Sequence, residues 1–205
     1  MNYLKLDVEI DFIILGERIK GGIYRPCLET IPSSTIKGAF RNYLGIEITG
    51  VGKFVKNSYQ IKDFVYCVKD KYLEISKMPF VTEYLAPKEE ERIKAEIYIV
   101  KNGMITPELF KNLEFSIGAL KSKGFGKTKV VNVEEIESHI KQGKLNIRIF
   151  EDEAGLFNIT VISPVYGYLF YPTNLISGVY KRALFEESLV RAPEVFLKEA
   201  TFYDE

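Results

Sequence analysis

Apolar and charged residues alternate along two separate stretches of the chain. Residues 4–14 place an apolar side chain at every even position and charged side chains at most odd positions. Residues 91–100 alternate in the same way, with apolar side chains at 93, 95, 97 and 99. Because successive side chains of a strand point to opposite faces, both stretches are predicted to be half-buried strands. Residues 46–85 alternate more weakly between turn signals and are interpreted as several antiparallel strands.

Apolar residues recur at helical spacing in two other stretches. In residues 33–44, SSTIKGAFRNYL, they lie three or four positions apart, and Ser33 or Ser34 is placed to cap the first turn. Residues 106–120 begin with Thr106 as a cap and Pro107 in the first turn, where its missing N–H costs nothing. The apolar stripe of this second predicted helix is Leu109, Leu113, Ile117 and Leu120. A strand at 127–133 and a short polar helix at 134–143 are predicted to follow.

The order of these elements indicates the fold class. A strand, a helix, several strands, a helix, a loop and a strand are typical of α+β domains, in which helices cover one face of an antiparallel sheet. The ferredoxin-like (RRM-like) fold is the small fold that fits this order best. We therefore predict a first domain at residues 1–143 with a glycine-rich loop, and a second, shorter α/β unit at 144–205 packed on it.

The last 60 residues repeat part of the first domain. Strands are predicted at 144–150 and 156–166, around the turn EDEAG, followed by a helix at 174–187. ISGVYKRAL at 176–184 resembles IKGAFRNYL at 36–44, and each follows an alternating stretch at a similar distance. Two interpretations stay open: a second, partial ferredoxin-like unit, or a chance agreement between two amphipathic helices with a glycine.

Composition limits the chemistry that the chain supports. The 205 residues hold 28 basic and 28 acidic side chains, so any affinity for nucleic acid has to come from a local patch. With one histidine and two cysteines, a zinc site of nitrogen and sulfur ligands is not expected, and we predict no metal or cofactor. No apolar run approaches the length of a membrane span, and the first residues do not resemble a signal peptide. We therefore expect a cytoplasmic protein with no membrane partner.

A lysine- and glycine-rich stretch, SIGALKSKGFGKTKV, is the first candidate site. A P-loop needs GxxxxGK[ST] between a strand and a helix, but Lys123 stands where the second glycine should be, and the predicted order is helix, loop, strand. The same order disfavours a Rossmann turn. Gly124 and Gly126 still allow a backbone to expose N–H groups to an anion, among four lysines and the ring of Phe125. Such a loop suits single-stranded RNA or DNA, or is an ordinary turn with Phe125 in the core.

The second candidate site is the start of the first predicted helix, IPSSTIKGAFR at 31–41. Free N–H groups of the first turn, three hydroxyl side chains, and Lys37 with Arg41 one turn later provide an anion site. The alternative is a plain capped helix with two solvated basic residues.

Together these two stretches resemble the RAMP superfamily of CRISPR-associated proteins. Its members carry an I-P-[GS]-[ST]-[ST]-[LI]-[KR]-G segment after the first strand and a glycine-rich R-[ST]-[RK]-G-[FY]-G loop before a later strand. The resemblance covers roughly residues 1–135, and LETIPSSTIKGAF is most similar to subunits of type III effector complexes. Ser33 departs from the pattern where glycine is common.

The resemblance implies a CRISPR RNA-binding protein that uses no metal and assembles with other Cas subunits of a type III complex. Carried over residue by residue, it implies that two sets of side chains contact or support the RNA. They are Lys121, Ser122, Lys123, Gly124, Phe125, Gly126 and Lys127 in the loop, and Ser33, Ser34, Lys37 and Arg41 in the helix.

Catalysis has little support in the sequence. RAMP endoribonucleases usually use a histidine, and the one present, His139, lies in a polar, surface-like stretch. Backbone subunits of type III complexes use an aspartate after the first strand, but residues 16–31 offer only Glu17 and Glu29. We therefore expect a non-catalytic RNA-binding subunit. A metal-independent endoribonuclease that processes repeat RNA, and a scaffold that never touches RNA, stay open as alternatives.

Overall fold

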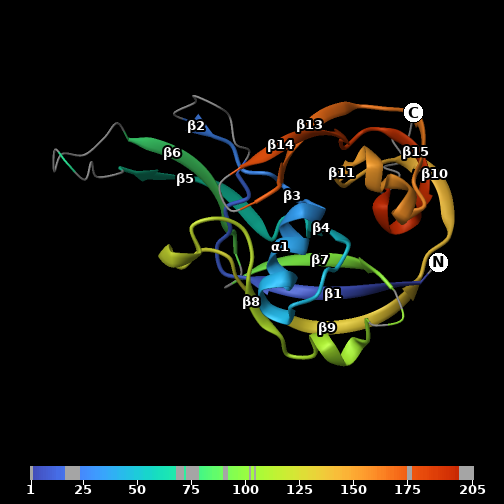
Figure 1. Cartoon of the computed structure of the whole chain (residues 1–205), viewed down its shortest axis with the longest axis horizontal. Coiled ribbons are helices and arrows are strands. Elements are labelled where there is room, and N and C mark those ends of the chain that lie inside the picture. The colour runs from blue at the N-terminus through green and yellow to red at the C-terminus, as the bar shows by residue number, and fades with distance from the viewer. Residues whose placement is uncertain are drawn as a thin grey trace.

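The computed structural model describes residues 2–16, 24–67, 72, 79–89, 92–101, 103, 105–174 and 177–198. Within these ranges the chain forms one α-helix, several 3-10 helices and four sheets (Figure 1). The predicted α+β class with an antiparallel sheet is confirmed, although strand is far more abundant than helix. Glu17, considered above as a catalytic candidate, lies outside the described residues.

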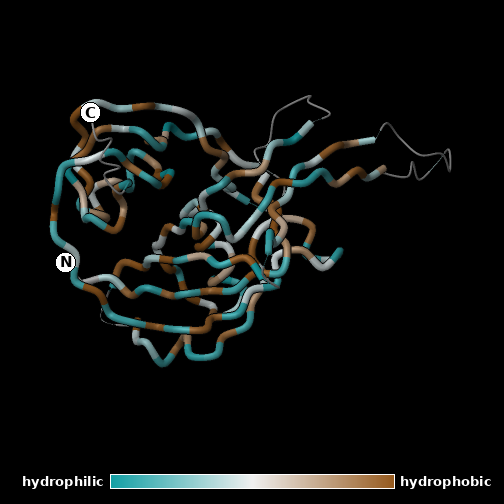
Figure 2. Tube along the Cα trace, turned by 180° about the vertical axis from the view of Figure 1, so that it is seen from behind, coloured by the Kyte–Doolittle hydropathy of each residue, from teal (hydrophilic) through white to brown (hydrophobic). Residues whose placement is uncertain are grey.

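A six-stranded antiparallel sheet forms the centre of the fold (Figure 1). In spatial order its strands are β3 (Thr30–Ile31), β4 (Gly50–Phe54), β7 (Ile93–Val100), β1 (Asn2–Ile10), β9 (Lys127–Glu137) and β8 (Glu114–Ser116). Hydrophobic and hydrophilic positions alternate along its strands (Figure 2). The even positions of β1 from Leu4 to Ile10 and the odd apolar positions of β7 are buried, which confirms both predicted strands, although the first ends at Ile10 instead of residue 14.

Helix α1 (Ser33–Leu44) covers one face of this sheet. Ile36, Ala39 and Phe40 of its apolar stripe are buried, whereas Tyr43 is 49% exposed, and the ring of Phe40 lies 5.3 Å from that of Phe110 and 5.1 Å from that of Phe115. The helix ends at Gly45, whose φ of 69° suits a residue without a side chain. The predicted helix is confirmed, but its capping is not: Pro32 occupies the N-cap position, and no side chain there makes a capping hydrogen bond.

A long hairpin projects from the sheet at the left of Figure 1. It consists of β5 (Tyr59–Tyr66) and β6 (Phe80–Pro87), and the two residues of β2 (Tyr24–Arg25) run parallel to β6. Together with β4, these strands confirm the several strands expected over residues 46–85.

The last quarter of the described chain is built from short strands and 3-10 turns. Its elements are β10 (Ile140–Lys144), β11 (Ile149–Phe150), η3 (Glu151–Phe157), β12 (Thr160–Ser163), β13 (Tyr166–Pro172), β14 (Gly178–Leu184), β15 (Leu189–Pro193) and η4 (Glu194–Phe196). They form two three-stranded sheets, β10-β15-β12 and β11-β14-β13. The β13–β14 hairpin arches over α1 in Figure 1.

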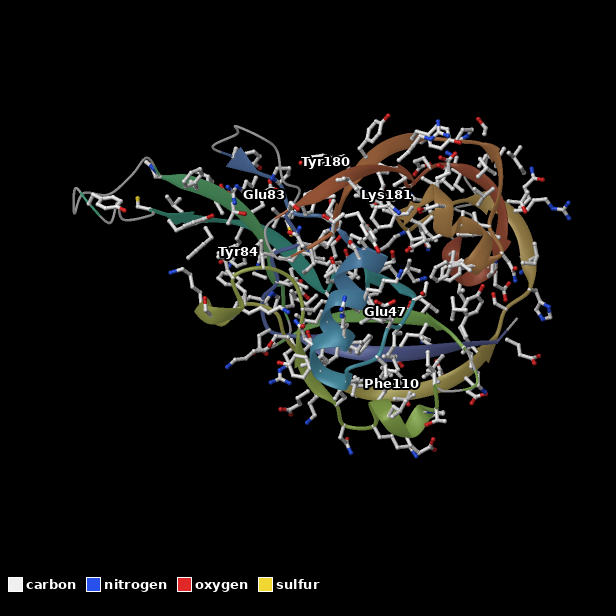
Figure 3. The ribbon with its side chains drawn as sticks, in the orientation of Figure 1. Glu47, Glu83, Tyr84, Phe110, Tyr180 and Lys181 are labelled. Atoms are coloured by element: carbon white, nitrogen blue, oxygen red, sulfur yellow. The ribbon has the colours of Figure 1, made fainter. Side chains whose placement is uncertain are left out.

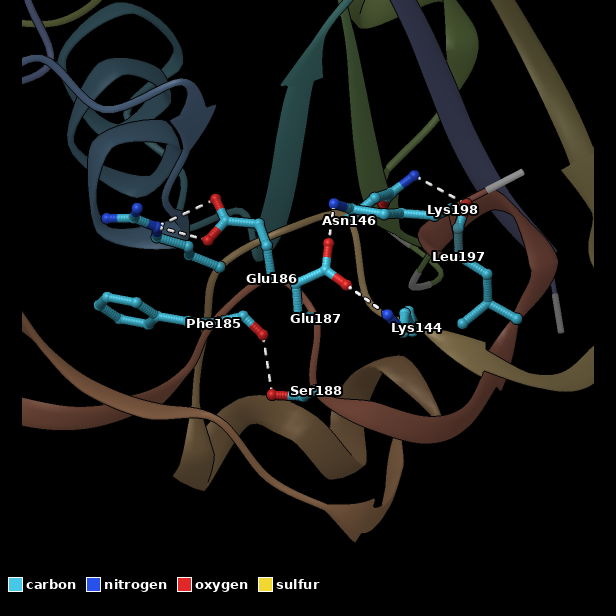
Figure 4. A network of polar contacts seen from close by, with 9 residues as sticks. Lys144, Asn146, Phe185, Glu186, Glu187, Ser188, Leu197 and Lys198 are labelled. Carbon is cyan, nitrogen blue, oxygen red and sulfur yellow. Dashed lines mark hydrogen bonds and ion pairs between the residues drawn. The ribbon is translucent and has the colours of Figure 1, made fainter. Parts of the chain in front are cut away.

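A polar network ties the turn between β14 and β15 to the segment before β11 (Figure 4). The carboxylate of Glu186 accepts hydrogen bonds from Arg148 Nε at 2.8 and 3.0 Å, and Glu187 pairs with both Lys144 and Lys198. Because each charge has an opposite neighbour, this turn is anchored although much of it is open to solvent.

Two hydrophobic clusters join this last part of the chain to the central sheet. The first lies between the sheet and α1 and includes Phe150, Leu169 and Ala183. The second lies against the other face, where the Tyr3 ring meets those of Phe157 and Phe196. Residues on both sides of position 143 therefore share buried contacts.

The predicted helix over 106–120 is wrong. A 3-10 turn, η1 (Pro107–Phe110), is followed by β8 and by a second 3-10 turn, η2 (Lys121–Lys123). Two non-glycine residues, Asn112 and Leu120, have positive φ and interrupt any helix. The alternate residues Phe115 and Ile117 are both buried, so the strand period outweighs the helical stripe.

The predicted helix over 134–143 is also wrong. β9 continues to Glu137 because its whole length pairs with β1, from Thr128 opposite Ile10 to Glu137 opposite Asn2. The chain then enters β10, which pairs with β15. Backbone pairing in a sheet overrides the weak helical preference of this polar stretch.

The internal repeat does not survive in three dimensions. Residues 178–184 form strand β14 instead of a helix, so they do not match α1. The ring of Phe170 fills the space that a side chain at Gly178 would need, with a Cβ there only 2.4 Å from it. The turn expected at EDEAG is part of the 3-10 helix η3, and the strand expected at 144–150 is reduced to Ile149–Phe150.

Candidate nucleic-acid interface

The glycine-rich loop is the connection of a hairpin between β8 and β9. Gly118, Gly124 and Gly126 have φ between 79° and 90°, a region in which other residues are strained. A Cβ on Gly126 would lie 1.8 Å from the carbonyl oxygen of Ile117, so only glycine fits there. Since strands stand on both sides of the loop and no helix follows it, the loop is not a P-loop.

The backbone amides of this loop are used inside the protein. Gly126 N–H donates to the carbonyl of Phe12 at 2.6 Å, and Gly124 N–H donates to that of Lys121 at 3.0 Å. These two amides therefore do not face an anion, in contrast to the expectation from the sequence. They hold the loop in one shape against the segment that follows β1.

The lysines of the loop are exposed and uncompensated. Within the described residues, Lys121, Lys123 and Lys127 have no ion-pair partner, whereas Lys129 lies 4.0 Å from Glu114. Three unpaired cations on one short loop form the local basic patch that a chain of zero net charge needs in order to attract an anion.

Phe125 is half-buried between the loop and the projecting hairpin. Its ring lies 5.3 Å from Phe64 of β5 and 5.5 Å from Tyr84 of β6, both in edge-to-face geometry. Figure 3 places Tyr84 at the base of the hairpin. Phe125 is thus a packing contact that fixes the loop against the hairpin.

At the start of α1, the basic side chain of Lys37 is neutralised by a carboxylate of the same chain. Ser33 is 1% exposed and donates its hydroxyl hydrogen to Glu153 of η3, whose carboxylate also lies 3.3 Å from Lys37 Nζ. An internal carboxylate therefore occupies the place near the helix N-terminus that the sequence suggested for an external anion. Arg41 is open to solvent and lies 3.9 Å from Glu47.

A cleft of about 610 Å³ brings parts of both motifs together. One wall is α1, where Ser34, Thr35, Gly38 and Asn42 line it; Gly118 and Lys121 of the loop line another. Ser34 and Lys121, one from each predicted stretch, thus line the same cleft. Ser33, Lys37 and Arg41 are not part of this cleft, and neither are Ser122, Lys123, Gly124, Phe125, Gly126 and Lys127.

The β13–β14 hairpin forms a third wall that sequence reasoning missed. Tyr168 and Tyr180 line the cleft with 64% and 49% of their surfaces exposed, and the Phe170 and Tyr180 rings lie 5.7 Å apart (Figure 3). Aromatic residues alternate along residues 166–172, YGYLFYP, and a glycine, Gly178, follows before the next apolar stretch. Both are strand signals that could have revealed this hairpin.

Catalytic groups are sparse in the described residues. His139 lies in the exposed connection between β9 and β10, and Glu29 accepts a hydrogen bond from Tyr59 at 2.6 Å. Burial raises the pKa of the Cys27 thiol to about 11, which keeps it protonated at neutral pH. In the part of the chain that the structure describes, no cluster of three His, Cys, Asp or Glu side chains could hold a metal ion. No helix there is long and apolar enough to cross a membrane.

Solved structures share this fold. No family model and no curated protein matches the sequence. A chain in the cryo-EM structure of the type III-B Cmr-beta bound to cognate target RNA and AMPPnP aligns with a TM-score of 0.61 at 12% identity, covering 92% of this chain and 86% of that chain. A chain of the same assembly bound to cognate target RNA aligns with a TM-score of 0.55 at 14% identity, covering 93% and 86%. The resemblance to type III CRISPR-associated proteins is thus confirmed at the level of the fold.

Proposed function

We propose that the chain is a CRISPR RNA-binding RAMP subunit of a type III CRISPR-Cas effector ribonucleoprotein, and so acts in antiviral defence. Three observations support this: the two-part motif, the fold shared with chains of type III-B assemblies, and the cleft in which parts of both motifs meet. The observation that carries the RNA-binding role is the unpaired charge of three lysines of the glycine-rich loop: Lys121, which lines that cleft, and Lys123 and Lys127, which lie outside it. Backbone phosphates of RNA provide the matching negative charge.

We further infer that the central sheet is a variant of the ferredoxin-like unit. Its strands β4, β7, β1 and β9 lie side by side in this order, all antiparallel, and α1 connects β1 to the segment leading to β4. In the position of the second helix of that fold, the described residues between β7 and β9 form only the 3-10 turns and β8. The glycine-rich loop thereby lies directly before β9.

The loop and the helix contribute to RNA binding in different ways. Lys121, Lys123 and Lys127 attract phosphates, and Ser122 and Ser34 offer exposed or half-exposed hydroxyls. The glycines and Phe125 hold the loop in shape. Ser33 and Lys37 anchor the start of α1 to Glu153, and Arg41 stands at the margin of the site.

Replacing Lys121, Lys123 and Lys127 together by alanine tests this proposal. We expect weaker binding of single-stranded RNA and a plot of log affinity against log salt that is shallower by about two, since each lost phosphate contact removes roughly 0.7 from the slope. The matched control replaces Lys101, Lys111 and Lys141, which lie outside the glycine-rich loop and each pair with a glutamate, and it changes the charge equally. An unchanged affinity and slope in the first variant would remove the loop from the RNA site.

The endoribonuclease alternative is tested separately. Labelled CRISPR repeat RNA incubated with the pure protein and EDTA is expected to stay intact, because the described residues that line the cleft include no histidine, aspartate or glutamate. Cleavage at a defined position would overturn the non-catalytic assignment. Other Cas subunits are the expected protein partners.

A further inference from the structure

The cleft between α1 and the β13–β14 hairpin is lined mainly by apolar and uncharged polar side chains, unlike a basic groove that binds only the phosphates of RNA. We infer that it holds one unstacked RNA base, which enters between α1 and the rings of Tyr168 and Tyr180 while its phosphate lies against Lys121. This inference rests on the proposed RNA-binding function and names the part of the RNA that the cleft takes.

The size and charge of the cleft fit a nucleotide. Its volume of about 610 Å³ is within the range of small-molecule sites. Among the described residues that line it, Lys121 is the one that carries a charge, and it stands beside the apolar side chains of Ile14, Leu28 and Leu169. A cleft with an apolar interior and a cation at its rim matches a ligand with an uncharged flat ring and an anionic tail.

The α1 wall presents polar groups that the protein itself does not use. Within the described part of the chain, the side chains of Ser34, Thr35 and Asn42 form no hydrogen bond. The edges of an unstacked base carry the donors and acceptors that such groups recognise. The exposed rings of Tyr168 and Tyr180 supply the stacking surfaces with which proteins hold single bases.

The cleft is open beside Gly38 of α1. Glycine inside a helix costs stability relative to alanine, and it is tolerated where a backbone or side chain approaches closely. Around Gly38 there is no such neighbour, because a Cβ placed there meets nothing within 4 Å. At Gly178, by contrast, the same atom would meet the Phe170 ring at 2.4 Å. Gly38 therefore leaves free space in the cleft, which is what an inserted base needs.

The test measures binding of a mixed-sequence single-stranded RNA of about 12 nucleotides to the full chain. Gly38→Leu fills the cleft, and Tyr180→Ala removes a stacking surface. We expect each to lower the affinity about tenfold with an unchanged salt slope, since no phosphate contact is lost. Gly38→Ala adds a single methyl group and should have a smaller effect than Gly38→Leu. Tyr43→Ala is the matched control, because Tyr43 is also a 49% exposed tyrosine but lies outside the cleft.

The outcomes separate this inference from the proposed function. If Gly38→Leu and Tyr180→Ala, shown by circular dichroism to be folded, bind RNA like the unchanged chain while the triple lysine variant does not, the base site is wrong and the RNA-binding role stands. If the triple lysine variant is also unaffected, both fail. Tyr168→Ala provides a second variant on an exposed side chain should Gly38→Leu not fold. Loss of a protein partner with unchanged RNA affinity would assign the cleft to that partner and overturn the base site.

Discussion

Two basic stretches approach the same cleft, and they differ in what neutralises them. In α1, Lys37 turns to Glu153, a carboxylate that is 8% exposed and that also accepts from Ser33. In the glycine-rich loop, Lys121 and its neighbours have no partner among the described residues. The first stretch uses its charge to hold the last part of the chain against α1, whereas the charge of the second is the one that the proposed function assigns to RNA. The two stretches therefore differ in role: the first stabilises the fold, and the second carries the proposed RNA contacts.

The largest effect is expected from changing the shape of the loop. Gly126→Ala places a Cβ against the Ile117 carbonyl at a φ of 79°, so it should destabilise the fold by about 3 kcal/mol or more. Thermal or denaturant unfolding measures this. Gly124→Ala is the matched control: its φ of 90° is also unfavourable, but its Cβ meets nothing within 4 Å, and we expect a loss of about 1 kcal/mol. Equal losses in the two variants would contradict the close approach to Ile117.

The anchor at the start of α1 should give the next largest effect. Glu153→Ala leaves Ser33 and Lys37 without their partner in a mostly buried site, and we expect a loss of about 2 kcal/mol in the free energy of unfolding. The control is Glu47→Ala, whose partner Arg41 is 73% exposed, with a change within about 0.5 kcal/mol. RNA affinity should not fall in Glu153→Ala, because Lys37 becomes free. A drop in affinity without a drop in stability would place Glu153 in the RNA site.

The smallest expected effect is the change in salt dependence of RNA binding when single lysines are replaced. Lys121→Ala should make the salt dependence of RNA binding shallower by about 0.7, the value for one phosphate contact to a single strand. Lys37→Ala should leave the slope as it is and lower stability instead, because its charge is directed at Glu153. If the slope changes equally in both variants, the contrast between the two stretches does not hold.

Much of the central sheet could be predicted because its strands follow a period of two. Residues 4–10 bury every second side chain, β7 buries its apolar residues at 93, 95, 97 and 99, and α1 buries Ile36, Ala39 and Phe40. The stretch 106–120 fails because its helical stripe is accompanied by a strand pattern at Phe115 and Ile117, and only tertiary packing on Phe40 chooses between them. The periodicity of the sequence alone therefore does not decide between helix and strand in this stretch.

The candidate site was predictable in its parts but not in its assembly. The loop lysines and Ser34 follow from the two motifs, whereas the internal use of Ser33 and Lys37 depends on Glu153, more than 100 positions away in the chain. The aromatic wall was missed because residues 174–187 fit a helical pattern as well as a strand. Gly178 and the aromatic alternation before it, read together, were the available signal.

Native purification of the protein from its source cells tests the central claim most directly. The account predicts that it elutes with other Cas subunits and with RNA of defined length whose sequence contains CRISPR repeat, and that nuclease treatment changes the size of the assembly. A stoichiometric protein partner with no co-purifying RNA would contradict the RNA-binding role and favour a scaffold.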